Sequence, residues 1–177
     1  KLQTLIMEVD KDLENYKIPE AARALQEYVD EMSNWYVRRG RERFWAKGMP
    51  QDKINAYTTL YTCLVTLSKA ISPMLPFITE DIYQNLVRSV DKDAKESIHL
   101  CNYPEVNLEY IDKELEEKMD QVLDIVVLGR NARNASNIKN RQPLKEMFVL
   151  AKPLDKFYNE IIEEELNVKK VTYIDDI

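Results

Sequence analysis

Apolar side chains recur every three or four residues through most of this chain, and this period limits the folds open to it more than any other feature. Residues 1–15 are representative, since Leu2, Leu5, Ile6 and Val9 share one face of a helix. Only three glycines occur in 177 residues, which fits helices joined by short connections. The period therefore predicts a mainly α-helical bundle.

Prolines and glycines divide this pattern into separate helices. Pro19 and Pro76 suit the first turns of helices, whereas Gly48 and Pro50 suit a helix end. Residues 88–108 have mixed charge and no clear period, so we expect an irregular segment there. The predicted helices span residues 1–15, 19–46, 51–72, 76–87 and 109–137.

Two of these helices carry long apolar stripes, which we expect to form the core. The stripe of the second helix is Leu25, Val29, Met32 and Tyr36. The stripe of the third helix is Ile54, Tyr57, Tyr61, Leu64, Val65, Ser68 and Ile71.

The pattern changes after Pro143. Residues 146–151 and 169–174 favour strands, and residues 153–166 favour a helix between them. A β-α-β unit of this size, ~35 residues, is too small to build a stable sheet alone. We therefore expect a helical domain over residues 1–143, followed over residues 144–177 by the truncated start of an α/β module.

The composition is that of a globular chain with enough apolar material for a core, at 45% hydrophobic and 32% charged residues. No apolar run approaches the ~18 residues of a transmembrane helix, and the start lacks a signal-peptide pattern. Because Lys1 already lies inside a helical pattern, we expect a piece of a longer, cytoplasmic polypeptide. Cys63, Cys101 and the single histidine, His99, do not have metal-ligand spacing, so no metal site is predicted.

The net charge of −6 hides two basic islands. Residues 38–47 hold five basic residues and one acid, and residues 130–145 hold five basic residues and no acid. Since these islands carry +4 and +5, the remaining residues carry −15. Basic islands in an acidic body are typical of a surface that meets a polyanion in one orientation.

The first island forms a ridge when it is projected on a helix of ~100° per residue. The ridge comprises Asn34, Arg38, Arg41 and Trp45, opposite the stripe of Leu25. Arginine binds phosphate or base edges in a bidentate manner, and an indole stacks on bases. Arg39 is a further candidate for RNA contact, whereas Trp35, Tyr36 and Phe44 point toward the core. Two structural alternatives stay open: Trp45 packs against a neighbouring helix, or the arginines pair with acidic residues.

The second island suits RNA backbone and sugar contacts, because it combines cations with asparagines. Its candidate residues are Arg130, Arg133, Asn137, Lys139 and Arg141. A structural explanation also stays open, because cations are favoured near a helix C-terminus.

The sequence shows no catalytic constellation. His99 has no nucleophile at a recognisable spacing, and the isolated glycines form no phosphate-binding loop. An active site within these residues is therefore not expected.

Three motifs carry a family resemblance that covers nearly the whole chain. The segment from Asn34 to Trp45 resembles the anticodon-binding helical domain of class I isoleucyl-tRNA synthetases. Residues 137–144, NIKNRQPL, resemble the exit from that domain. Residues 72–83, SPMLPFITEDIY, resemble a turn and helix that the isoleucine, valine and leucine enzymes share.

The resemblance implies a tRNA-binding domain that recognises the anticodon stem-loop of isoleucine tRNA. It implies that Asn34 and Arg38, one turn apart, meet the anticodon. The catalytic domain would lie elsewhere in the same polypeptide and would use ATP and magnesium, for which these residues carry no site. The family's ATP-site signatures are absent here, and so is the zinc-binding region of some relatives. The alternatives are the equivalent domain of a valyl or methionyl enzyme, and a helical protein-interaction domain.

Overall fold

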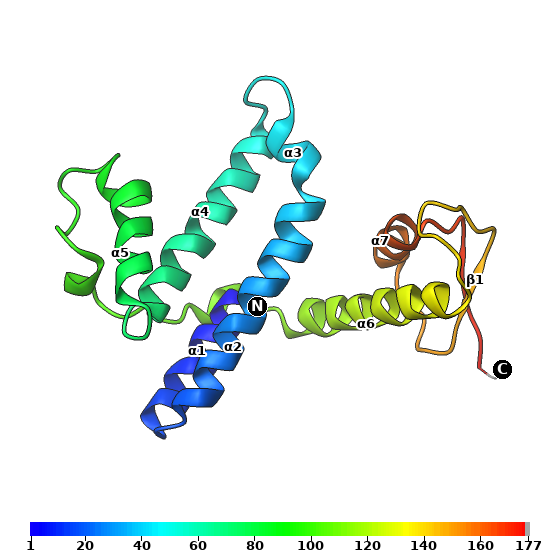
Figure 1. The fold of residues 1–177 in the computed structure, drawn as a ribbon, viewed down its shortest axis with the longest axis horizontal. Coiled ribbons are helices and arrows are strands. Elements are labelled where there is room, and N and C mark those ends of the chain that lie inside the picture. The colour runs from blue at the N-terminus through cyan, green and yellow to red at the C-terminus, as the bar shows by residue number, and fades with distance from the viewer. Residues whose placement is uncertain (176–177) are drawn as a thin grey trace. The chain divides into compact units, whose positions relative to one another are not determined.

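The computed structural model describes residues 1–175 and divides the chain into two compact units. The first unit is Lys1–Ile111, and the second begins at Asp112. Helices dominate both units, which confirms the predicted mainly α-helical class (Figure 1). No helix of the described residues has the length and apolarity that a membrane span requires.

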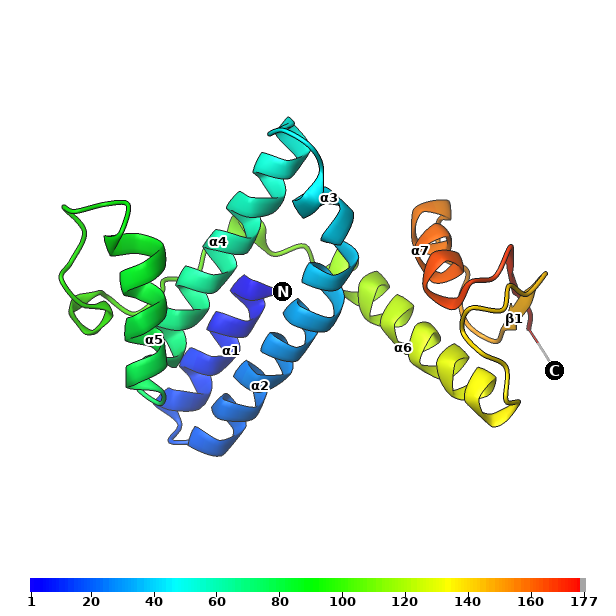
Figure 2. The same cartoon turned by 45° about the horizontal axis from the view of Figure 1, so that its top comes forward.

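The first unit is built from helices alone. Its α-helices are α1 (Leu2–Glu14), α2 (Ile18–Glu31), α3 (Arg41–Trp45), α4 (Gln51–Ile71) and α5 (Pro76–Tyr83). Two π-helices are η1 (Met32–Val37) and η2 (Gln84–Arg88), and two 3-10 helices are η3 (Ile98–Leu100) and η4 (Leu108–Tyr110). Helices α1 and α2 lie side by side and antiparallel, with α4 and α5 next to them (Figure 2).

The core of this unit lies where α1, α2 and the C-terminal part of α4 meet. Its buried residues are Leu5, Ile6, Val9, Ala21, Leu25, Leu67 and Ala70. The predicted stripe of α2 is buried only at its start, since Leu25 is 2% exposed and Val29 is 37% exposed. Helix α1 runs along α2 as far as Glu31, which pairs with Lys1, but Val29 lies on another flank of α2 and lines a groove with Ile71 and Met74.

The predicted stripe of α4 is also buried at one end only. Ser68 is 5% exposed, whereas Ile54, Tyr57 and Tyr61 are 39% to 45% exposed. The expectation that these three residues belong to the core is wrong, because the N-terminal half of α4 extends beyond α1 and α5 (Figure 1).

Helices α1 and α6 end on residues with a left-handed backbone that are not glycine. Tyr16 has φ 58° and Asn137 has φ 55°. After α1, the amide of Lys17 donates to the carbonyl of Asp12 and that of Tyr16 to the carbonyl of Leu13, which is the Schellman arrangement. A Pro residue, Pro19, then starts α2, as predicted.

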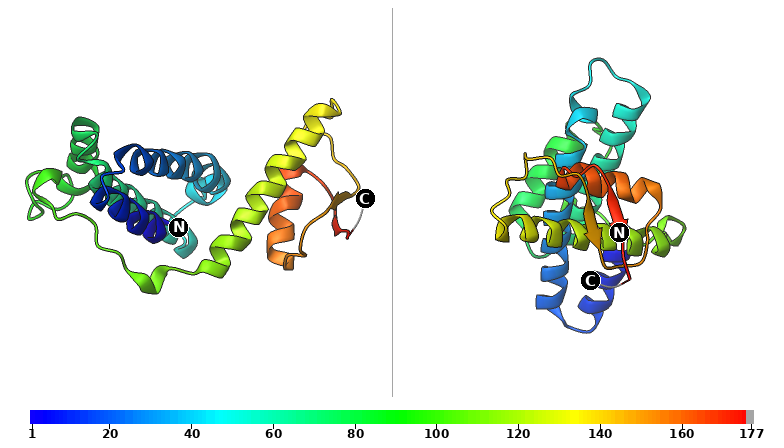
Figure 3. Two further views of the ribbon diagram at one scale, coloured as in Figure 1. Left: turned by 90° about the horizontal axis from the view of Figure 1, so that it is seen from below. Right: turned by 90° about the vertical axis from the view of Figure 1, so that its right-hand side faces the viewer.

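The second unit is a helix followed by a β-α-β element. It contains α6 (Lys113–Ala135), β1 (Met147–Val149), α7 (Lys156–Leu166) and β2 (Val171–Tyr173). The strands pair in parallel, with Met147 opposite Val171 and Val149 opposite Tyr173, so the predicted β-α-β order is correct. Figure 3 shows α7 beside α6.

The packing of α6 on α7 depends on Gly129. A Cβ atom at this position would lie 2.4 Å from Cδ1 of Leu166, so the buried Leu166 side chain could not keep its present position. Because α6 packs on α7, the predicted domain boundary at residue 143 falls inside the second compact unit. The end of the helical domain at residue 143 stays a prediction.

Candidate nucleic-acid interface

The first basic island lies at the closed end of a helical hairpin, formed by η1 and α3 on one side and α4 on the other (Figure 1). Three aromatic rings pack together at this end. The ring of Phe44 lies edge-on to Tyr36 at 6.2 Å and to Tyr57 at 5.2 Å. The hydroxyl of Tyr36 donates to the carbonyl of Ala56 at 3.3 Å. Phe44 is 8% exposed, so the prediction that Phe44 points inward is correct.

Gly40 makes this packing possible. A Cβ atom there would lie 2.8 Å from Cε2 of Phe44 and 2.9 Å from the carbonyl oxygen of Tyr36. The helix predicted over residues 19–46 is interrupted in the structure, by the π-helix η1 and by a turn at Gly40. The apolar period alone carries no signal for either feature, because the period predicts one regular helix.

Two polar contacts hold α3 against the start of α4. The guanidinium of Arg43 donates to both carboxylate oxygens of Asp52, at 2.8 and 2.7 Å. This bidentate pair lowers the pKa of Asp52. The ammonium of Lys53 donates to the carbonyl of Ala46 at 2.8 Å and so satisfies the end of α3. Arg43 is thus one arginine of the island that serves the hairpin itself.

All four ridge residues are exposed. Trp45 is 75% exposed, so the alternative in which Trp45 packs against a neighbouring helix is not what the structure shows. Trp35 and Tyr36 are half-buried, as expected. An indole this exposed has an open face for a partner, whereas a typical tryptophan is mostly buried.

The ridge arginines lie along their own helices. The guanidinium of Arg41 lies 5.2 Å from the ring centre of Trp45, and that of Arg39 lies 5.4 Å from the ring centre of Trp35. Nε of Arg38 donates to the backbone carbonyl of Asn34 at 2.8 Å. These contacts orient the side chains, so less entropy is lost when a ligand binds them.

The second island is different, because its most central arginine is structural. Arg133 is 5% exposed, and its guanidinium donates to four backbone carbonyls at 2.6 to 3.2 Å. These carbonyls belong to Lys139, Gln142, Leu166 and Asn167. The interpretation of Arg133 as an RNA contact is therefore incorrect for this structure: the residue ties the segment after α6 to the end of α7.

Arg130 is also engaged within its unit. Its guanidinium pairs with the carboxylate of Glu165, a side chain that is only 7% exposed. A buried carboxylate needs a charged partner, so this pair has a structural role. Asn137 closes α6, since the amide of Ile138 donates to the carbonyl of Arg133 and the amide of Asn137 to that of Asn134. Lys139, Arg141 and Lys145 are exposed, so three cations of this island are directed to solvent.

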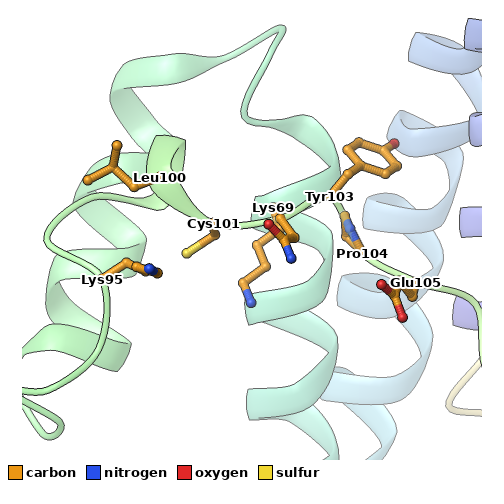
Figure 4. A pocket seen from close by; sticks show the side chains of 8 residues that line it. Lys69, Lys95, Leu100, Cys101, Tyr103, Pro104 and Glu105 are labelled. Atoms are coloured by element: carbon orange, nitrogen blue, oxygen red, sulfur yellow. The ribbon is translucent and has the colours of Figure 1, made fainter.

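A pocket of about 520 Å³ lies beside α4 in the first unit (Figure 4). Its lining includes Lys69, Lys95 and Cys101, whose thiol lies 3.6 Å from the hydroxyl of Tyr83. Burial raises the pKa of Tyr83 to about 12, so this hydroxyl stays protonated and donates to the carbonyl of Lys95. No histidine lines the pocket, and residues 1–175 contain no cluster of metal-ligating side chains.

Comparison with known proteins identifies the family of this chain. A family model described as "Anticodon-binding domain of tRNA ligase" matches residues 1–149. Over its full length the chain is 57% identical to an isoleucine--tRNA ligase of Clostridium novyi and 52% identical to one of Clostridium tetani. Over 96% of its length it is 44% identical to isoleucine--tRNA ligase 2 of Bacillus cereus.

The chain spans about one sixth of these relatives, 17% of the length of each clostridial ligase. Their names describe whole ligases, whereas the family model describes the domain that residues 1–149 form. The described helices agree with the matched family model. The chain belongs to the family of anticodon-binding domains of tRNA ligases.

Proposed function

We propose that this chain is the part of an isoleucine–tRNA ligase that binds the anticodon stem-loop of isoleucine tRNA. The contact surface in this proposal is the ridge of Asn34, Arg38, Arg41 and Trp45, with Arg39 beside it. The relatives named above support the choice of amino acid. The single observation that supports this choice of contact surface is the 75% exposure of Trp45 next to the guanidinium of Arg41.

The chemistry of the ridge suits an anticodon loop. Such a loop displays unstacked bases, which proteins read through stacking and through hydrogen bonds to base edges. Trp45 offers the stacking surface, the amide of Asn34 offers a donor and an acceptor, and Arg38 and Arg41 offer cations for phosphate. Lys139, Arg141 and Asn137 in the second unit are proposed as additional backbone contacts.

The whole ligase would join isoleucine to its tRNA with ATP and magnesium, in a catalytic part of the same polypeptide. The present residues would contribute affinity for the tRNA and discrimination among anticodons.

The test is the affinity of the chain for the anticodon stem-loop of isoleucine tRNA, measured by fluorescence anisotropy at several salt concentrations. Trp45→Ala is expected to cost about 1–3 kcal/mol of binding free energy through lost stacking. Arg41→Ala is expected to reduce the salt dependence of the affinity by about one phosphate contact. Arg23→Ala, an exposed arginine of α2 outside the ridge, is the matched control and should bind as the unaltered chain does.

Anticodon variants of the same stem-loop test the amino acid. A valine or methionine anticodon is expected to compete poorly against the isoleucine anticodon. Equal competition by all three, or equal affinity of Trp45→Ala, Arg41→Ala and Arg23→Ala, would be incompatible with the proposal.

A further inference from the structure

A second group of exposed large hydrophobic side chains, two of them aromatic, lies on α4, outside the ridge. We name Ile54, Tyr57 and Tyr61 the α4 stripe. These residues are spaced three and four apart, so they share one flank of the helix within an arc of ~60°. Their exposed fractions are 39%, 45% and 45%. Exposed apolar side chains in one contiguous line are typical of a binding surface.

The α4 stripe begins where the ridge ends. The ring of Tyr57 lies edge-on to Phe44 at 5.2 Å, and its hydroxyl donates to the carbonyl of Phe44 at 3.4 Å. Phe44 directly precedes Trp45 in the chain. Tyr57 is therefore anchored beside the last ridge residue, and Tyr61 follows one helical turn further along α4. The anchor fixes the ring of Tyr57 before any ligand arrives.

Charge indicates which partner fits this stripe. Residues 1–31 hold eight acids and four basic residues, whereas residues 32–79 hold seven basic residues and only two acids. One of these two acids, Asp52, is paired with Arg43. From Lys53 to Thr79 no acid occurs at all. The stripe thus lies in the one part of the first unit that attracts polyanions, and a nucleic acid fits it better than a basic protein surface would.

We propose that the α4 stripe is a second base-stacking surface, on which Tyr57 and Tyr61 take unpaired nucleotides of the RNA that the ridge holds. Tyrosine rings stack on any base, so the surface selects unpaired nucleotides over duplex without selecting a sequence. The rise between Tyr57 and Tyr61 is ~6 Å, nearly twice the ~3.4 Å step of a stacked strand. The two rings therefore suit bases that have left a continuous stack, as in a loop. This inference rests on the proposed function and extends it to a surface on a different helix.

Tyr61 is the residue to test, because Tyr57 also supports the hairpin through Phe44. Tyr61→Ala is expected to weaken binding of the isoleucine anticodon stem-loop by about tenfold, the equivalent of about 1.4 kcal/mol. Tyr61→Phe keeps the ring and should bind as the unaltered chain does. Phe77→Ala removes an aromatic ring of α5 that is 89% exposed and lies outside the stripe, so it is the matched control. Circular dichroism of each variant establishes that its helices are intact.

A second readout separates stacking from charge. Tyr61→Ala should leave the salt dependence of binding unchanged, because no phosphate contact is lost. It should also lower the preference for the stem-loop over a fully paired duplex of the same length. If Tyr61→Ala binds as Phe77→Ala does while the ridge variants bind weakly, the stripe proposal is overturned and the proposed function stands. The stripe would then be a face for protein contact. If the ridge variants and Tyr61→Ala all bind RNA as the unaltered chain does, both the stripe proposal and the proposed function are overturned.

Discussion

At the scale of single residues, the same side-chain type serves opposite purposes in the two basic islands. Arg41 lies exposed along the ring of Trp45, whereas Arg133 is buried among four carbonyls. The sequence predicts both as RNA contacts, because both are arginines in an acid-poor neighbourhood. The difference arises from carbonyls that follow Arg133 by six to 34 residues, and such distant partners leave no local pattern.

Arg133→Met tests the structural role of this residue. The variant keeps an apolar stem of similar length but removes the donors to four carbonyls. We expect it to destabilise the second unit by about 1–3 kcal/mol, because buried acceptors are left without partners. Hydrogen exchange of the α6 and α7 amides would then be faster. Arg141→Met, which removes an exposed cation of the same island, should leave this exchange unchanged. Equal protection in the two variants would show that the carbonyls do not need Arg133.

At the scale of elements, the helices themselves are the best-predicted part of the fold. The third predicted helix, 51–72, is observed as Gln51–Ile71, and the predicted strands and helix after Pro143 are found in the predicted order. Interruptions of helices were not predictable from the period. The π-helix Met32–Val37 has no signal in the apolar period, and at the turn Gly40 leaves room for the ring of Phe44, which is a tertiary contact.

The irregular segment after α5 depends on one carboxylate. Burial acts to raise the pKa of Glu80, but hydrogen bonds from Gln84, Ser97 and the amide of Ile98, together with the charge of His99, outweigh it and hold the pKa below its usual value. A carboxyl whose pKa is lower in the folded chain stabilises that chain above its unfolded pKa, ~4.3. The contribution is lost as the pH falls through the folded pKa.

We therefore expect the amide of Ile98 to lose protection from hydrogen exchange as the pH falls below about 4.3. Glu80→Gln cannot ionise, so its protection at Ile98 should be lower at pH 6 and should change little on acidification. Glu109→Gln, an exposed acid in the same unit, is the control and should follow the unaltered chain. If Glu80→Gln keeps the full pH dependence of protection at Ile98, the dependence comes from another titrating group.

At the scale of the whole molecule, the contacts between elements and the sequence pattern place the boundary between the two parts of the chain at different residues. The pattern changes at Pro143, where helices give way to strands, and it therefore predicts a boundary there. The compact units part at Ile111 instead, because α6 packs on α7 through Gly129. A helix has the same period whichever partner covers it, so the period cannot assign α6 to a unit.

Two fragments test this division. Residues 1–111 alone should keep the protection of α1, α2 and α4, because the core of the first unit is closed within these residues. Residues 1–143 add α6 without α7, so the amides of α6 should exchange at nearly the rate of an unfolded chain. Strong protection of α6 in the longer fragment would instead favour a boundary at residue 143. Far-ultraviolet circular dichroism would give the helix content of both fragments.

The π-helix Met32–Val37 affects how the length of the chain before the ridge can change. Its hydrogen bonds reach back five residues instead of four, so the turn holds one more residue than an α-helical turn does. Loss of one residue here would leave a continuous α-helix and would keep Arg38 to Trp45 facing nearly the same way, whereas loss of one residue from the regular helix α2 would rotate them by ~100° about its axis. This single turn can therefore lose one residue while the ridge keeps its direction, whichever side chains the ridge carries.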